Sequence, residues 1–235
     1  MSLINKSLKP TKYYDIILAI FVSFLLISNI SAVKLIDING FLTDGGAILF
    51  PLTYIFGDIL TEVYGYRYTR RAIWTAFAVM VIASLTFIIV GLLPSAADWP
   101  NQGSWNDILG FVPRIVLASL CAFLVGQFVN AYVLAKIKAK YGKERLWIRL
   151  VGSTMIGELL DTTIFAVVAF AGTGFLSGSE MLKYILIGWL FKTAVEIVLL
   201  PLSYFIINKL KNAEHKDTFD TKTDFNPFKL DAWES

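Results

Sequence analysis

Long apolar segments alternate with short polar ones along this chain. Six segments are apolar enough to be read as membrane-spanning helices, and they cover residues 13–33, 46–64, 72–93, 111–135, 150–172 and 181–207. Each is close to the roughly 20 residues that a helix needs to cross the hydrocarbon core of a bilayer. The second segment is the weakest, because it contains Pro51 and Gly57 and its apolar part is short. The pattern therefore predicts an all-α membrane protein, a bundle of six transmembrane helices.

The polar segments predict how this bundle is organised. A transmembrane domain is expected over residues 1–210, and a mobile cytoplasmic tail over residues 211–235, where the chain is polar and lacks periodicity. Between the first two spans, Asn39-Gly40 lies between β-forming residues, which predicts a short hairpin on the outer side.

Lysine and arginine residues predict the orientation. All but four of the 21 basic residues lie in the N-terminal segment, in the loops after the second and fourth spans, and after the sixth span. Six spans place all of these on one side of the membrane, which is the cytoplasmic side by the positive-inside rule. Both termini are therefore expected to be cytoplasmic.

Composition supports a membrane protein and excludes nucleic acid as a partner. Hydrophobic residues make up 56% of the chain and charged residues only 17%, against about a quarter charged in soluble domains. The net charge of +3 arises from basic residues beside the spans, where lipid headgroups are the expected neighbours. No metal-ligand spacing or nucleotide-binding loop is present, and no cofactor is predicted. Small residues in the fifth span, Gly152, Ser153 and Gly157, would allow close helix contacts and a homo-oligomer.

Ionisable residues inside the spans are the candidates for function, because charge is costly in a membrane and usually faces the bundle interior. Spacing places them in stripes on single helix faces. The second span carries Tyr54, Asp58 and Glu62 at intervals of four residues. The stripes on the other helices comprise Asn29 in the first span, Gln127 and Asn130 in the fourth, Glu158 and Asp161 in the fifth, and Lys192 and Glu196 in the sixth. Arg114 stands at the outer start of the fourth span.

Two interpretations of these charges remain open. Lys192 can neutralise Glu196, Glu158 or Asp161, and the loop arginines can pair with Asp58 or Glu62, so that the charges only join helices. Against this, five acids face a single base at comparable depth, and the excess indicates a site for cations or hydrogen-bond donors. Pro51 and Gly57 beside Asp58 also allow an interrupted helix, where transporters often build their sites.

One family resemblance rests on extended motifs. The segment from Phe50 to Gly65, which reads FPLTYIFGDILTEVYG, strongly resembles the signature of the queuosine precursor transporter family, also described as a vitamin uptake transporter family. Further matching motifs are PRIVLAS from Pro113, RLVGST from Arg149, DTTIF from Asp161, the segment from Lys192 to Glu196, and PLSY from Pro201. The resemblance covers the chain from the first span to about residue 210.

This resemblance implies import of 7-deazaguanine precursors of queuosine, the 7-cyano or 7-aminomethyl base, across the bacterial inner membrane. A guanine-type base presents an N–H and an NH₂ side by side, and a carboxylate such as Asp161, Glu158 or Glu196 accepts both. The amides of Gln127 and Asn130 would meet the carbonyl and ring nitrogens. Aromatic rings such as Tyr54 or Phe165 would stack on the base. Asp58 or Glu62 would favour a cationic aminomethyl group.

Two alternatives belong to other classes. The chain would also suit the substrate-binding subunit of an ATP-energised vitamin importer, and Ala19 and Ser23 offer a weak small-residue docking face on the first span. An intramembrane aspartyl enzyme, with Asp58 and Asp161 sharing a proton, is the less favoured one. The only histidine, His215, lies in the tail, so the sequence favours a transporter over an enzyme.

Overall fold

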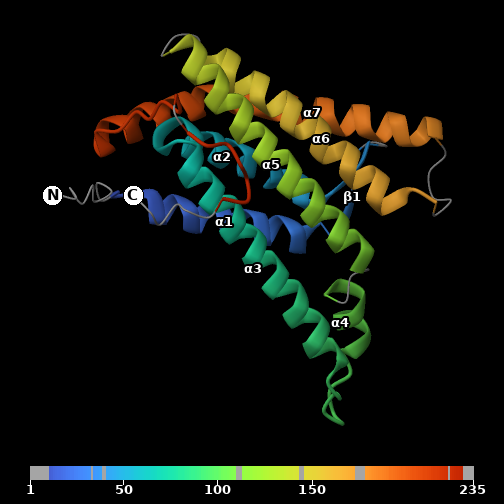
Figure 1. Ribbon diagram of the computed structural model, residues 1–235. Coiled ribbons are helices and arrows are strands. Elements are labelled where there is room, and N and C mark those ends of the chain that lie inside the picture. The colour runs from blue at the N-terminus through green and yellow to red at the C-terminus, as the bar shows by residue number, and fades with distance from the viewer. Residues whose placement is uncertain are drawn as a thin grey trace.

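The structure is a computed structural model that describes residues 11–32, 34–38, 41–109, 113–142, 146–172, 178–221 and 223–229. Helices dominate this part of the chain (Figure 1). The α-helices are α1 (Tyr14–Ser31), α2 (Phe50–Tyr64), α3 (Tyr66–Leu92), α4 (Gln102–Ile108), α5 (Pro113–Tyr141), α6 (Leu146–Phe170) and α7 (Gly178–Glu214). Between α1 and α2 lie strands β1 (Leu35–Ile38) and β2 (Phe41–Asp44) and a 3-10 turn, η1 (Gly45–Ile48).

Five helices are long and apolar enough to cross a membrane: α1, α3, α5, α6 and α7. The remaining predicted span, the second, corresponds to α2, which has only 15 residues and is buried along most of its length. Pro51 stands in the first turn of α2, where its missing N–H is not needed, and Gly65 ends it with a φ of 88°. The second apolar segment is thus a short helix, enclosed by other helices rather than exposed like its neighbours.

Strands β1 and β2 correspond to the predicted hairpin, and the turn residues Asn39 and Gly40 lie outside the described part of the chain. β1 and β2 pair antiparallel, with Leu35 opposite Asp44 and Ile38 opposite Phe41. The backbone continues from β2 through η1 into α2, and the Ser28 hydroxyl donates a hydrogen bond of 3.0 Å to the Gly46 carbonyl. That bond fixes the end of α1 against the entry to α2.

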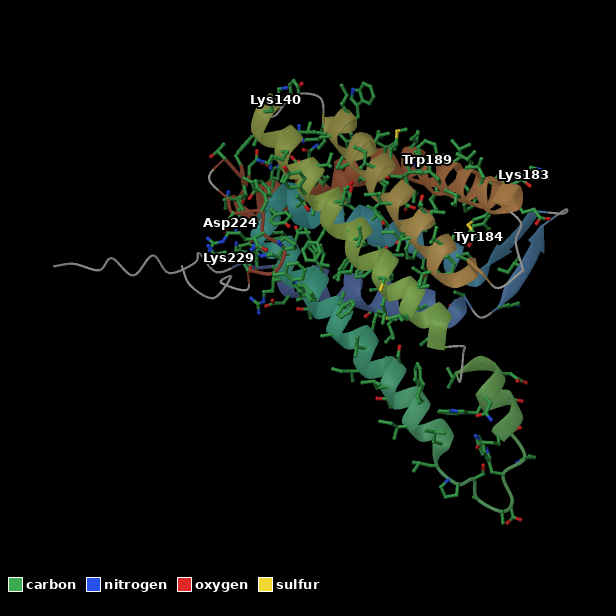
Figure 2. The ribbon with its side chains drawn as sticks, turned by 45° about the vertical axis from the view of Figure 1, so that its right-hand side comes forward. Lys140, Lys183, Tyr184, Trp189, Asp224 and Lys229 are labelled. Atoms are coloured by element: carbon green, nitrogen blue, oxygen red, sulfur yellow. The ribbon has the colours of Figure 1, made fainter. Side chains whose placement is uncertain are left out.

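The two ends of the bundle contain different connections (Figure 1). One end holds the start of α1, the α2–α3 junction, the end of α5, the start of α6 and the end of α7. There the Glu214 carboxylate accepts hydrogen bonds from the Tyr13 N–H at 2.7 Å and the Tyr64 hydroxyl at 2.8 Å. The opposite end holds β1 and β2, the end of α6, the start of α7, and α4, which lies beside the end of α3. Figure 2 shows Lys140, Asp224 and Lys229 at the first end and Lys183 and Tyr184 toward the other.

The segment that follows α7 packs against the helices. A mobile tail was expected from residue 211, but α7 continues to Glu214, and the described residues up to 229 lie over α3 and α5. The Tyr66 N–H donates to Asp220 at 3.1 Å, the Arg70 guanidinium to the Asn226 carbonyl at 2.7 Å, and the Trp74 indole to the Pro227 carbonyl at 2.7 Å. Because Asp220 is only 4% exposed, this segment is part of the packed body.

α5 and α6 make the most extensive helix contact, and glycines allow it. A Cβ on Gly157 would lie 2.8 Å from the Asn130 Cβ and 2.9 Å from the Gly126 carbonyl oxygen. Small residues let two helix backbones approach closely. Gly157 was one of the small residues that suggested an oligomer, but here it allows a close contact between two helices of the same chain.

We predict that Gly157→Ala lowers the stability of the folded protein by about 1–3 kcal/mol, because the added methyl overpacks the α5–α6 contact. Gly152→Ala on the same helix is the matched control, since its Cβ would meet only Ile137, at 4.0 Å. Thermal unfolding in detergent measures the difference. Equal midpoints for the two variants would contradict the close contact.

A second prediction concerns the attachment of the tail. Burial opposes ionisation of Asp217, but hydrogen bonds from Lys138 and Lys211 outweigh it and hold the Asp217 pKa below its usual value. The stabilisation is therefore present above the ordinary aspartate pKa and is lost as the pH falls through the lowered one. The protection of residues 215–221 against hydrogen exchange, relative to the intrinsic exchange rate at each pH, should fall on acidification, whereas Asp217→Asn should show low protection at neutral pH already. Identical profiles for the variant and the wild type would refute this role.

Candidate functional site

Four helices bring polar side chains together in the middle of the bundle. We call this the central polar cluster, and its members are Tyr54 and Asp58 of α2, Gln127 and Asn130 of α5, Glu158 and Asp161 of α6, and Lys192 and Glu196 of α7. Eight of the twelve residues selected from the sequence meet here. Each lies on the helix stripe that the spacing predicted.

Direct contacts tie the cluster together. The Asn130 amide donates to Asp58 Oδ1 at 2.6 Å, and the Thr154 hydroxyl lies 3.5 Å from Asp58 Oδ2. Glu196 of α7 is 3% exposed, and its Oε2 atom has no hydrogen-bond partner among the described residues. Glycines provide the space, because a Cβ on Gly57 would lie 2.5 Å from Gln127 Oε1.

Lys192 neutralises only part of the cluster. Its ammonium lies 2.9 Å from Asp161 Oδ2 and 3.4 Å from Glu158 Oε2, and it stands over the Phe50 ring at 4.3 Å from the centroid. The interpretation of Lys192 as an ion-pair partner is thus confirmed for Asp161 and Glu158. One lysine faces four carboxyl groups, so the cluster keeps an acidic excess.

Many polar atoms of the cluster are buried without a hydrogen-bond partner. Within the described residues these atoms are the Tyr54 hydroxyl, both side-chain amide atoms of Gln127, Asn130 Oδ1, both carboxylate oxygens of Glu158, Asp161 Oδ1, the Thr193 hydroxyl and Glu196 Oε2. Buried polar groups are hydrogen-bonded in the great majority of cases. Their concentration at one place, from four helices, is the pattern of a site that binds a polar ligand.

Thr193 was missed by the sequence analysis, although it lies between Lys192 and Glu196 in the chain. Thr154, one turn before Glu158 on α6, places its hydroxyl 3.5 Å from Asp58 Oδ2. Phe50 gave no signal beyond its place in the motif, because only packing shows that its ring meets Lys192.

Four selected residues lie outside the central cluster. Asn29 hydrogen-bonds to the Leu25 carbonyl at 2.9 Å and accepts from Ser119 at 2.7 Å, so it joins α1 to α5. Phe165 is half-buried one turn beyond Asp161 on α6. Arg114 lies in the first turn of α5, and its side chain is outside the described part. Glu62 belongs to a separate ion network.

This network surrounds Glu62 near the end of α2. The Glu62 carboxylate accepts bonds of 2.8 and 2.7 Å from Arg149 and one of 2.5 Å from Lys211. Lys138 donates to the Glu62 backbone carbonyl and to Asp217 at 2.7 Å. Expected pairing of Glu62 with the loop arginines 67, 70 and 71 is wrong, because its partners come from α5, α6 and α7. The network joins these helices to α2.

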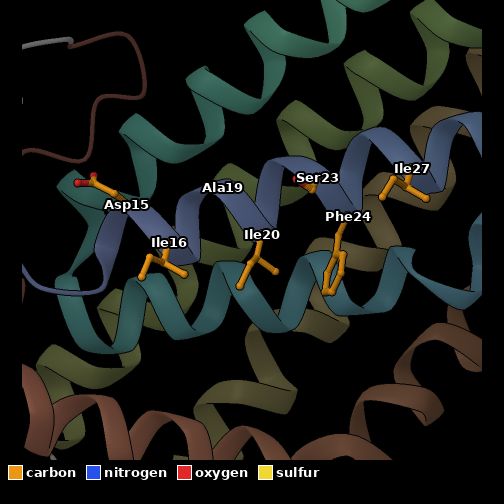
Figure 3. A pocket seen from close by; sticks show the side chains of 7 residues that line it. All are labelled: Asp15, Ile16, Ala19, Ile20, Ser23, Phe24 and Ile27. Atoms are coloured by element: carbon orange, nitrogen blue, oxygen red, sulfur yellow. The ribbon is translucent and has the colours of Figure 1, made fainter.

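An open groove of about 470 Å³ runs along α1 on the outside of the bundle. Figure 3 shows its lining of Asp15, Ile16, Ala19, Ile20, Ser23, Phe24 and Ile27. Ala19 and Ser23, the two small residues that suggested a docking face, therefore both line this groove. The central polar cluster does not contribute to it.

Comparison with known proteins identifies the family. The sequence profile of the family described as "Putative vitamin uptake transporter" matches residues 44–206, which include the whole central polar cluster. The chain belongs to this family. No solved structure matches it.

Curated relatives of this family member come from bacteria. The chain is 33% identical to the "Probable queuosine precursor transporter" of Bacillus subtilis over 80% of its own length and 81% of that protein. It is 29% identical to the "Queuosine precursor transporter" of Escherichia coli over 74% of its length and 77% of that protein. With its five apolar helices, the chain is a multi-pass bacterial membrane protein.

The network around Glu62 generates a prediction about stability. Glu62→Gln removes the carboxylate and leaves Arg149, Lys138 and Lys211 partly buried without their main partner, which should cost about 3–5 kcal/mol. The exposed pair of Asp224 and Lys229, 3.2 Å apart, is the matched control, and Asp224→Asn should leave stability unchanged. Chemical denaturation in detergent measures both. A Glu62→Gln protein as stable as the wild type would contradict a structural role for this network.

Proposed function

We propose that this protein imports queuosine precursors, the 7-cyano or 7-aminomethyl derivatives of 7-deazaguanine, across the bacterial inner membrane. The observation that carries the proposal is the set of buried, unpartnered polar atoms in the central polar cluster. The names of the curated relatives supply the substrate class.

The cluster offers the groups that a guanine-type edge requires. Such an edge presents N–H and NH₂ donors side by side, and the free oxygens of Glu158 and Asp161 are acceptors on one helix face. The Gln127 amide, which has both a donor and an acceptor without partners, suits the carbonyl and ring nitrogens of the base. The Tyr54 ring, fully buried at the centre, suits stacking on its face.

The acidic excess bears on the choice of precursor. An aminomethyl group is a cation at neutral pH, and the cluster holds four carboxyl groups against Lys192. A buried negative site attracts a cation, and this electrostatic contribution to binding is absent for the neutral cyano group. We therefore propose that both bases bind and that the aminomethyl base binds more tightly.

For topology, we propose six passes with both termini in the cytoplasm. α2 then counts as a short pass that lies within the protein instead of facing lipid. The end of the bundle that holds Glu214 and the Glu62 network is cytoplasmic in this arrangement, in line with the positions of the basic residues.

A ligand-dependent thermal shift tests the proposed substrate. The wild-type protein in detergent should be stabilised by both deazaguanine bases, by about 2.7 kcal/mol at a concentration a hundred times Kd. Glu158→Gln and Asp161→Asn should weaken binding about 10- to 100-fold, because each removes one charged hydrogen-bond acceptor. Asp98→Asn, an exposed carboxylate in the loop after α3, is the matched control and should bind like the wild type. Equal stabilisation by guanine would show a purine transporter without specificity for the deazaguanines. No stabilisation by any of these bases would refute the proposed function.

The second candidate is a substrate-binding subunit that requires an ATP-driven partner. The groove on α1, with Ala19 and Ser23 in its lining, is the observation that favours it (Figure 3). Uptake of the base into liposomes that contain this chain alone, without ATP, would exclude that candidate. Binding without any uptake would support it over an independent transporter.

The intramembrane aspartyl enzyme finds less support. Asp161 accepts a hydrogen bond from Lys192 at 2.9 Å, whereas Asp58 accepts one from Asn130 at 2.6 Å and lies 3.5 Å from the Thr154 hydroxyl. The two aspartates therefore have different hydrogen-bond partners in the described structure. The relatives are named as transporters.

A further inference from the structure

The ammonium of Lys192 is held as the amine of a ligand would be. It lies 2.9 Å from Asp161 Oδ2 and 3.4 Å from Glu158 Oε2. It also donates to the Thr162 hydroxyl at 3.3 Å and stands 4.3 Å from the centroid of the Phe50 ring. Carboxylates and an aromatic face are the groups with which proteins bind ammonium ligands. The lysine of α7 therefore fills an ammonium site that α6 and the start of α2 build.

Lys192 contacts an oxygen that a guanine-type base would need. Such a base donates an N–H and an NH₂ side by side, and the two oxygens of one carboxylate accept them together. Asp161 Oδ1 is buried without a hydrogen-bond partner, whereas Asp161 Oδ2 accepts from Lys192. An aminomethyl group would seek the same carboxylates as the lysine. The base and the Lys192 ammonium therefore compete for Asp161.

The acids of this site need a cation when no base is bound. The side chains of Glu158 and Asp161 are only 1% and 4% exposed, whereas that of Lys192 keeps 20%. A buried carboxylate without a partner is costly in a membrane. The cations around Glu62 are engaged in their own network. Lys192 is thus the residue that compensates Glu158 and Asp161, and it is the least enclosed of the three.

We propose that Lys192 is a tethered cation that occupies the substrate site of the empty transporter and is displaced from Asp161 by the incoming base. The inference rests on the proposed transport function. Binding of the base breaks the ion pair between Lys192 and Asp161 and replaces it with hydrogen bonds from the base. When the base leaves, the ammonium returns and compensates the acids again.

The position of Lys192 connects this exchange to a contact between helices. Its ion pairs join α7 to α6, as does the hydrogen bond of 2.9 Å from the Trp189 indole to the Met155 carbonyl. A ligand shifts a conformational equilibrium only if it contacts two states differently. The base meets this condition, because it removes one of the connections between α6 and α7.

The empty transporter must return to the outside before it can import another base. With Lys192 in place it returns with Glu158 and Asp161 compensated, whereas without Lys192 both acids would be buried without their cation. Exchange of one base for another avoids this step, because a base is bound in both directions. Net import should therefore depend on Lys192 and exchange should not.

Two variants should change the affinity for the aminomethyl base in opposite directions. Lys192→Met removes the competitor, and the base should bind about tenfold more tightly if the ammonium occupies the site about nine-tenths of the time. Lys192→Arg should weaken binding about tenfold, because a guanidinium bonds to both oxygens of a carboxylate. Lys183→Met, at an exposed lysine of the same helix, is the matched control and should bind like the wild type. Thermal shifts in detergent measure these affinities. Weaker binding in both variants, as for a lysine that only holds helices together, would overturn the inference.

Liposomes separate net uptake from exchange. With unlabelled base inside, Lys192→Met should still exchange it for labelled base outside. Without base inside, its net uptake should fall about tenfold or more, because the empty form returns with uncompensated acids. Lys183→Met should match the wild type in both assays. Loss of exchange together with net uptake, or full net uptake by Lys192→Met, would contradict the proposed role.

A measurement without substrate separates this inference from the proposed function. Lys192→Ala removes three carbons and the ammonium, which propylammonium can supply. This amine should raise the thermal midpoint of Lys192→Ala by about 3–6 °C at roughly ten times its Kd, and it should leave Lys183→Ala unchanged. Propanol, which has the same length without the charge, should not replace it. A Lys192→Ala protein that folds only with the amine would support the inference as well.

The two failures can be told apart. A wild-type protein that binds no deazaguanine base would refute the proposed function, while the amine would still show whether the acids of α6 take up a free ammonium. Equal responses of Lys192→Ala and Lys183→Ala to propylammonium would refute the tethered cation.

Discussion

Neutralisation of buried charge is the constraint on which the rest of this structure depends. A carboxylate deep among apolar helices is costly unless a cation, a hydrogen-bond donor or a proton compensates it. Glu62 obtains three cations, Asp161 and Glu158 share Lys192, and Asp58 accepts a hydrogen bond from Asn130. Each solution joins different helices, so the arrangement of charges sets the arrangement of the bundle.

α2 is the helix that this constraint places at the centre. It carries Asp58 and Glu62 one turn apart, and their partners come from α5, α6 and α7. A helix with two such residues cannot face lipid, and α2 is buried along most of its length. The same burial permits it to be short, because it need not match the thickness of the bilayer by itself.

The two buried charge clusters differ in how completely they are satisfied. Around Glu62 the carboxylate has strong bonds from Arg149 and Lys211, and the segment after α7 closes over the network through Asp217. In the central polar cluster many polar atoms lack partners. A fully satisfied network makes a helix junction rigid, whereas an unsatisfied one is where natural proteins depart from optimal packing for function. This contrast places the rigid junction at one end of the bundle and the candidate binding site at its middle.

The sequence by itself determined the parts of this protein that depend on local pattern. Apolar segments of sufficient length predicted the membrane helices, Asn39-Gly40 predicted the hairpin, and intervals of three and four residues placed the acids on single helix faces. Eight of the selected residues converge because each polar stripe must turn away from lipid. A polar stripe can be recognised in the sequence of a single helix.

Only the tertiary structure decided which charges meet. Glu62 pairs with Arg149, which is 87 residues away, and not with the arginines of the adjacent loop. Asp58 accepts a hydrogen bond from Asn130 of α5, which is 72 residues away. The segment after Glu214 packs on α3 through backbone carbonyl groups, which no side-chain pattern reveals. Such choices depend on the rotation and depth of each helix in the bundle, and these are fixed by packing between residues far apart in the chain.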